Sequence, residues 1–100
     1  MIWLLFWACA ADPCAPMCDA AATAWGVCLA QRDAAWPDAG WADEADFLDG
    51  CGTWAWAQRK LARDAGDVDV DAICADRTAT ISAAADPCDV TRLDWDGPAF

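Results

Sequence analysis

The stretch DPCAPMCDAAATAWGVCLAQR (residues 12–32) decides the fold, because it carries three of the seven cysteines on what reads as one helix. Its apolar and sulfur-bearing side chains recur at steps of three and four residues, which is the period of an α-helix. The face consists of Cys14, Cys18, Ala21, Trp25, Cys28 and Arg32. Three later cysteines, Cys51, Cys74 and Cys88, lie one in each segment that follows. We therefore predict a first helix to which the later segments are bonded.

The composition excludes several classes of function. The chain of 100 residues has a net charge of −11, contains no histidine, and has Ser82 as its single serine. These counts remove imidazole metal sites and Ser–His nucleophile pairs, and so acidic a chain repels nucleic acid and anionic membrane surfaces. We expect a single domain with no enzyme activity, no cofactor and no nucleic-acid partner.

The first residues have the pattern of an export signal. Residues 2–7 form an apolar run that is too short to span a bilayer, and small residues follow it. No Lys or Arg precedes the run, which a start codon assigned too far downstream would explain. We divide the chain into a leader at residues 1–10 and one cysteine-rich helical domain at residues 11–100. Alternatively, residues 1–9 form the first buried apolar segment of the domain.

Cys9 accounts for the odd number of cysteines, since an exported chain rarely keeps a loose thiol. The motif Phe6-Trp7-Ala8-Cys9 resembles the lipobox of bacterial lipoproteins, although Phe6 and Trp7 replace the usual Leu and small residue. The resemblance implies that Cys9 is acylated and anchors the protein to a membrane. Cleavage ahead of Ala11 would instead release a secreted domain without Cys9. Either outcome leaves six cysteines, an even set for disulfides.

Two more helices follow the first. The second is predicted from about Asp43 to Ala65, with an acidic first turn and a basic last turn that suit the helix dipole. Its inward face is Phe47, Cys51, Trp54, Gln58 and Leu61, with Leu48, Ala55 and Ala62 alongside. Gly66 is the predicted C-cap, and a third helix is predicted from Asp67 or Asp69 to about Ala84. The predicted fold class is all-α, a small three-helix up-down-up bundle with a short C-terminal turn or helix, held together by about three disulfides.

Packing geometry favours particular disulfides. In an antiparallel pair, late residues of the first helix lie beside early residues of the second, which favours Cys28 with Cys51. A third helix parallel to the first places Cys74 beside Cys14 or Cys18, and Cys88 takes the cysteine that remains. The alternative interpretation is a zinc site, but only Cys14 and Cys18 have the close spacing of thiolate zinc ligands. We expect disulfides and no metal.

Three tryptophans are candidates for an aromatic surface. The segment WPDAGW (residues 36–41) has turn residues between two tryptophans. Trp36 and Trp41 would either stack against a sugar ring or an apolar partner, or fold over one end of the helical core as a lid, which we favour. Trp56 falls off the buried stripe of the second helix, so we expect it to be half exposed.

An acidic cluster gives a weaker signal for a cation. Asp67, Asp69 and Asp71 have the spacing of the first three ligands in an EF-hand calcium loop. Ala72 stands where that loop requires Gly, and Thr78 stands where it requires a bidentate Glu. The cluster therefore fits an aspartate-rich helix N-terminus better than a calcium loop.

The expected function follows from the disulfides and the leader. We expect a small exported protein that is a structural or protein-interaction component of a bacterial cell envelope, with another envelope protein as partner. It would be periplasmic, outer-membrane-anchored or extracellular, and would touch a membrane only through a lipid on Cys9. The alternative is a secreted module that binds a sugar or a divalent cation. An exposed apolar patch would favour a partner, and a concave pocket would favour a ligand.

Overall fold

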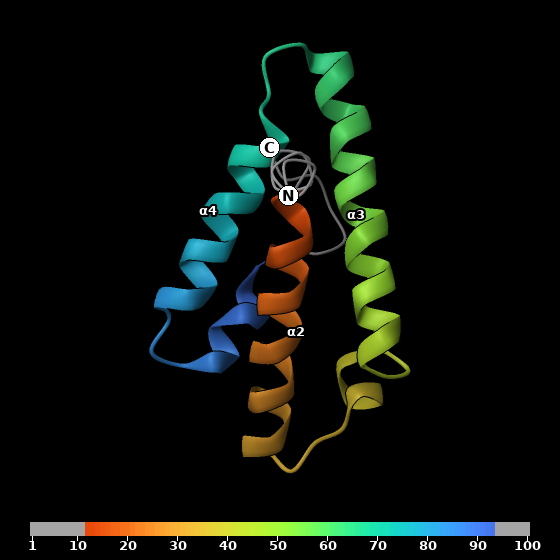
Figure 1. Ribbon diagram of the computed structural model, residues 1–100. Helices are drawn as coiled ribbons and strands as arrows, with labels where there is room; N and C mark the ends of the chain where they lie inside the picture. Colours follow the sequence, from red (N-terminus) through yellow and green to blue (C-terminus); the bar gives the residue numbers. More distant parts are fainter. Residues whose placement is uncertain (1–11, 94–100) are drawn as a thin grey trace, which may run out of the picture.

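The computed structural model describes residues 12–93, so the leader and Cys9 lie outside the described residues. The α-helices are α2 (Cys14–Gln31), α3 (Glu44–Ala65) and α4 (Val70–Ala83), and two 3₁₀ helices are η1 (Trp36–Ala39) and η2 (Pro87–Arg92). Helix α3 runs antiparallel to α2, and α4 returns parallel to α2 (Figure 1). The predicted all-α, up-down-up bundle with a short C-terminal helix is confirmed.

Aspartates and a glycine set the ends of α3 and α4. The side chain of Asp43 accepts a hydrogen bond of 2.8 Å from the N–H of Asp46, and that of Asp69 accepts one of 3.2 Å from Ala72. Each bond satisfies a donor that has no partner inside its helix. Helix α3 ends at Gly66, whose φ of +91° lies in the left-handed region that favours glycine.

Helices α2 and η2 begin with the same local turn. The sequence DPC occurs at residues 12–14 and again at residues 86–88. In each copy the aspartate carboxylate accepts a hydrogen bond from the cysteine N–H, at 3.0 Å in the first and 2.9 Å in the second. Proline suits the first turn because the N–H that it lacks would have no helical partner. Both turns place a cysteine at the start of a helix, and both cysteines are in disulfides.

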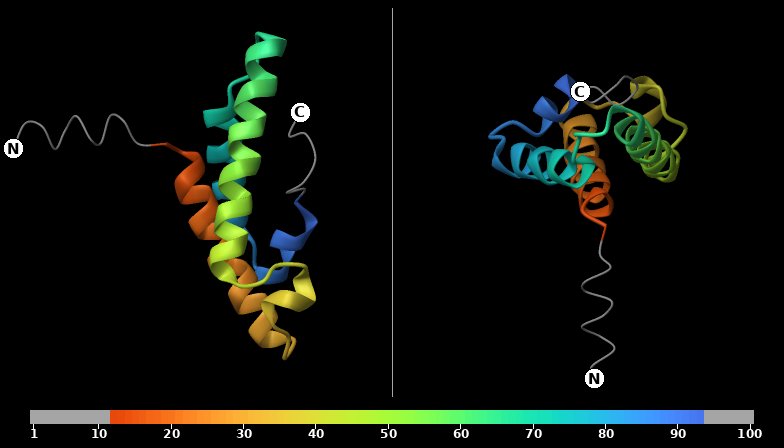
Figure 2. Two further views of the ribbon diagram at one scale, coloured as in Figure 1. Left: turned by 90° about the vertical axis from the view of Figure 1, so that its right-hand side faces the viewer. Right: turned by 90° about the horizontal axis from the view of Figure 1, so that it is seen from above.

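Helix α2 is the centre of the bundle. It packs against α3, α4 and η2, whereas α3 and α4 touch each other only slightly. Seen from above in Figure 2, α3 and α4 lie on two sides of α2. Met17 of α2, Phe47 of α3 and Cys74 of α4 are completely buried. The hydrophobic core therefore follows the sides of α2 that face the other helices.

Three disulfides join the other elements to α2. Each involves a different neighbour, and all six cysteines are buried. The pairs are Cys14–Cys74 to α4, Cys18–Cys51 to α3, and Cys28–Cys88 to η2. The expectation that Cys74 would meet Cys14 or Cys18 is confirmed.

The predicted pairing of Cys28 with Cys51 is wrong. Because Cys18 is bonded to Cys51, the antiparallel register places the start of α3 level with Trp25 and not with the end of α2. The rings of Trp25 and Phe47 are accordingly 6.3 Å apart. The connection that contains η1 turns back before α3 begins, so the last turn of α2 extends past α3 (Figure 2). There Cys28 is bonded to Cys88 of η2 instead, so the prediction that Cys88 pairs with Cys14 or Cys18 is also wrong.

The end of α3 also departs from the predicted inward face. Leu61 is 43% exposed, whereas Ala62 is only 8% exposed and joins the core together with Val70. The last turns of α3 rise beyond the start of α2 (Figure 1), so α2 does not cover this end of α3. The buried face turns there toward the connection into α4.

Candidate functional site

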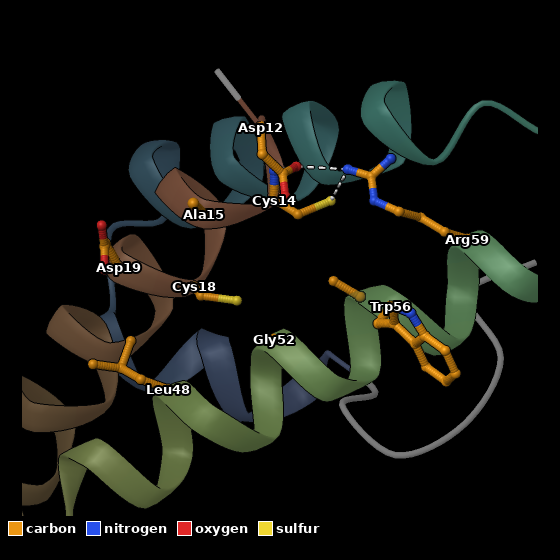
Figure 3. A pocket seen from close by; sticks show the side chains of 10 residues that line it. Asp12, Cys14, Ala15, Cys18, Asp19, Leu48, Gly52, Trp56 and Arg59 are labelled. Atoms are coloured by element: carbon orange, nitrogen blue, oxygen red, sulfur yellow. Dashed lines mark hydrogen bonds and ion pairs between the residues drawn. The ribbon is translucent and has the colours of Figure 1, made fainter. Parts of the chain in front are cut away.

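A groove of about 390 Å³ lies between α2 and α3. Figure 3 shows Asp12, Cys14 and Arg59 at one end of it, and Asp19 and Leu48 at the other. Trp56 lines its α3 side and is 61% exposed, which makes it the most exposed large apolar side chain between residues 12 and 93. This groove is the strongest candidate site in the described part of the chain.

The groove exists because small residues face each other across the two helices. On α3, Leu48, Gly52, Ala55 and Trp56 lie on one face at helical spacing. Ala15 lines the α2 side. Among residues 12–93, no heavy atom from outside this stretch of α3 lies within 4 Å of the place that a Cβ on Gly52 would take, so the described fold leaves the space above this residue open. The result is a hollow with a mainly apolar lining.

Arg59 closes one end of the groove by bridging three helices. Its Nη2 atom lies 2.6 Å from a carboxylate oxygen of Asp12 and 2.7 Å from one of Asp71. The hydrogen bond that it donates to Asp71, with the negative charges of Asp12 and Asp71, outweighs desolvation and raises the pKa of Arg59 above its usual value. The guanidinium therefore stays protonated and ties the starts of α2 and α4 to α3.

The three aspartates with the spacing of a calcium loop do not come together as ligands of one ion in the described residues. Asp69 caps α4 through its side chain, and Asp71 pairs with Arg59. Between residues 12 and 93, Asp67, Asp69 and Asp71 do not form a group with ligand atoms close enough to hold one ion. The three aspartates form a helix N-terminus, as their sequence context indicates.

A different set of candidate ligands does come together. Oxygen or sulfur atoms of Asp12, Cys14 and Asp71 lie within 4.8 Å of one another. However, Cys14 is bonded to Cys74, and the Arg59 guanidinium contacts all three residues, at 3.5 Å from the Cys14 sulfur. Arg59 thus occupies the position that a metal ion would need.

Trp36 and Trp41 pack around Phe47 at the opposite end of the bundle from Arg59. Their ring centroids lie 5.8 Å and 5.1 Å from that of Phe47, and both tryptophans are half-buried. A Cβ on Gly50 would lie 2.7 Å from a ring carbon of Trp41, so glycine is what allows the ring to approach α3. This is the arrangement of a lid over one end of the helical core.

The three candidate tryptophans do not gather on one surface. Within residues 12–93, Trp56 makes no ring contact with Trp36 or Trp41, and instead Lys60 Nζ lies 5.7 Å from its ring centroid. The contact between Arg59 and Asp12 has no signal in the sequence, because it joins residues 47 positions apart. The helical spacing of Leu48, Gly52 and Trp56 was the one available signal for the groove.

Comparisons with protein-family models, with curated proteins and with solved structures found no match to this chain. Within residues 12–93, no helix combines the length and the apolar character needed to cross a membrane. A functional assignment therefore depends on the disulfides and the groove.

Proposed function

We propose that this chain is an exported protein-interaction module of a bacterial cell envelope, and that the groove between α2 and α3 is its binding surface. The disulfides support export, because three buried disulfides form and persist in oxidising compartments and are rare in the cytosol. They also account for stability in a chain whose core is small.

The observation that carries the interaction role is the position of Trp56. A tryptophan that is 61% exposed beside an apolar hollow is typical of protein-binding surfaces, where aromatic anchors supply much of the affinity. The disulfide Cys18–Cys51 joins the two helices that form the walls. Because this covalent bond fixes the distance between the two helices, the groove loses less conformational entropy when a partner binds.

The groove is concave, a shape that by itself favours a ligand, but its apolar lining suits a protein side chain better than a sugar. Sugar recognition relies on many hydrogen bonds to hydroxyl groups, whereas this lining is mainly Ala, Gly, Leu, Trp and cystine sulfur. The polar groups at the Arg59 end are already paired with one another. The groove therefore favours a protein partner over the alternative of a sugar.

A lipid on Cys9 would attach the domain to a membrane at a defined point. Asp12, three positions after Cys9, is held by Arg59 of α3. Such an anchor would join a fixed corner of the bundle and keep the groove near the membrane surface without inserting the domain.

Export is tested by location and thiol content. A reporter enzyme that is active only outside the cytosol, fused after Phe100, should be active. The purified unreduced protein should show no free thiol beyond Cys9. A Cys9→Ser variant should lose any incorporated fatty acid. An inactive reporter together with free thiols at the six other cysteines would contradict the proposal.

Partner binding is tested in the cell with a photo-reactive amino acid at position 56, and with the same group at Asp76 of α4 as control. Both positions are exposed, but only position 56 lines the groove. We expect a discrete adduct with an envelope protein from position 56 alone. Equal adducts from both positions, or none from position 56, would rule out the groove as the binding surface.

A further inference from the structure

We infer that the groove receives a basic segment of the partner, which places one apolar side chain beside Trp56 and Lys or Arg side chains on Asp19 and Asp49. This inference rests on the proposed function, because it names the chemistry of the partner at the same groove.

Two carboxylates beside the apolar lining have no counter-charge. Asp19 lines the groove from α2. Asp49 lines a second hollow, which shares Leu48, Gly52 and Trp56 with the groove. No ion pair within residues 12–93 includes Asp19 or Asp49, so neither carboxylate is paired in the described part of the chain. Unpaired carboxylates on two sides of an apolar surface are complementary to a segment that carries both positive and apolar side chains.

The ring of Trp56 already contacts a cation. Lys60, one helical turn along α3, places its ammonium 5.7 Å from the ring centroid. This arrangement is a cation–π contact, which is weak where water reaches it. A basic side chain of a partner can replace Lys60 or use the free part of the ring, since Trp56 is 61% exposed.

The net charge of the chain disfavours several other occupants of the groove. A net charge of −11 opposes a second copy of the chain, an anionic lipid surface and nucleic acid. The same charge attracts a basic segment and speeds its association, by an amount that falls as salt is added. A cationic polypeptide is therefore the occupant that the surface fits.

The test uses the full, disulfide-bonded protein and the acetylated peptide KLAKKLAKKLAK as probe, with ELAEELAEELAE as its charge-inverted counterpart. Affinity is measured by titration calorimetry at low and moderate salt, and backbone NMR shifts identify the surface that binds. We expect only the lysine peptide to bind, with shifts concentrated on residues 48–56 and 15–19.

Two pairs of matched variants distinguish binding in the groove from general electrostatic attraction to an acidic protein. Asp19→Asn with Asp49→Asn should weaken binding of the lysine peptide by about tenfold, from two solvent-exposed ion pairs. Asp64→Asn with Asp76→Asn changes the net charge equally at exposed positions outside the groove, and should weaken it by no more than about twofold. Gly52→Gln should fill the hollow and abolish binding, while Gly26→Gln, at an equally open position of α2, should not.

The outcomes distinguish this inference from the function on which it rests. Equal weakening by the two charge pairs, binding of the glutamate peptide, or no binding of either peptide overturns the basic-segment inference. Concentration-dependent dimerisation through Trp56 also overturns it, because a second copy would then be the occupant. Each of these results leaves an adduct from position 56 in the cell as an independent sign of partner binding. Trp56→Ala provides a second blocking variant if Gly52→Gln does not fold.

Discussion

Two alanine substitutions in α3, only two residues apart, should change stability in opposite directions. Replacing glycine with alanine inside a helix gains about 1 kcal/mol of helix propensity. At Gly52 no atom from elsewhere in the described part of the chain lies within 4 Å of the new Cβ, so Gly52→Ala should stabilise the protein by about this amount. At Gly50 the same gain is opposed by Trp41, since the new Cβ would lie 2.7 Å from one ring carbon and 3.3 Å from another.

The cost at Gly50 follows from what Trp41 would lose. To clear the methyl group, the ring must leave its edge-to-face contact with Phe47, where the centroids are 5.1 Å apart. That contact is worth about 0.5–1.5 kcal/mol, and re-exposing part of the ring costs about 1–2 kcal/mol more. Gly50→Ala should therefore be net destabilising by about 1–2 kcal/mol. The two alanine variants should differ by about 2–3 kcal/mol.

The assay is guanidinium unfolding of the disulfide-bonded protein, followed by circular dichroism, with midpoints compared at equal m-values. Repeating both substitutions in a Trp41→Ala background gives a double-mutant cycle. There Gly50→Ala should stabilise as much as Gly52→Ala. If Gly50→Ala already stabilises the chain that retains Trp41, the aromatic lid does not pack on α3 and the reasoning fails.

Further predictions concern the disulfides, the Arg59 bridge and the exposed tryptophan. Cys28→Ala with Cys88→Ala opens a loop of 60 residues and should lower the free energy of unfolding by about 4 kcal/mol, measured by denaturant unfolding. Arg59→Gln should cost about 1 kcal/mol after solvent screening, and thermal melts should show this cost shrinking in high salt. Because folding raises the pKa of Arg59, its contribution is complete at neutral pH and is lost only as the pH rises through the strongly alkaline pKa of the folded state. The Arg59→Gln penalty should therefore be constant between about pH 6 and pH 9, and a loss of the penalty within that range would contradict this assignment. Trp56→Ala should cost under about 0.5 kcal/mol in the same melts, since this side chain is 61% exposed.

The helices could be predicted from the sequence because their limits are set locally. Asp43 and Asp69 each cap the helix that begins at the next residue, and Gly66 ends α3 in a left-handed conformation. These residues interact with backbone atoms only a few positions away in the sequence. The local sequence is therefore enough to predict where each helix begins or ends. The inward orientation of the cysteines followed from helical spacing for the same reason.

The disulfide register and the groove depend on distant parts of the chain. Cys28 misses Cys51 because the connection that contains η1 turns back before α3 begins, a path that depends on how Trp36 and Trp41 pack on Phe47. The helical spacing of residues in the sequence gives no information about the path of this connection. The Arg59 bridge likewise joins residues far apart in sequence, and the hollow at Gly52 exists only where α2 and α3 face each other.

Because every disulfide includes a cysteine of α2, the peptide connections between the helices are not the only links that hold the chain together. A protease that cut in residues 32–43, in residues 66–69 and in residues 84–86 would leave α3, α4 and η2 each covalently attached to α2. We expect such a nicked protein to migrate as one species without reductant and to separate into fragments with it. In a compartment rich in proteases, this arrangement would let the domain survive cleavage of its loops.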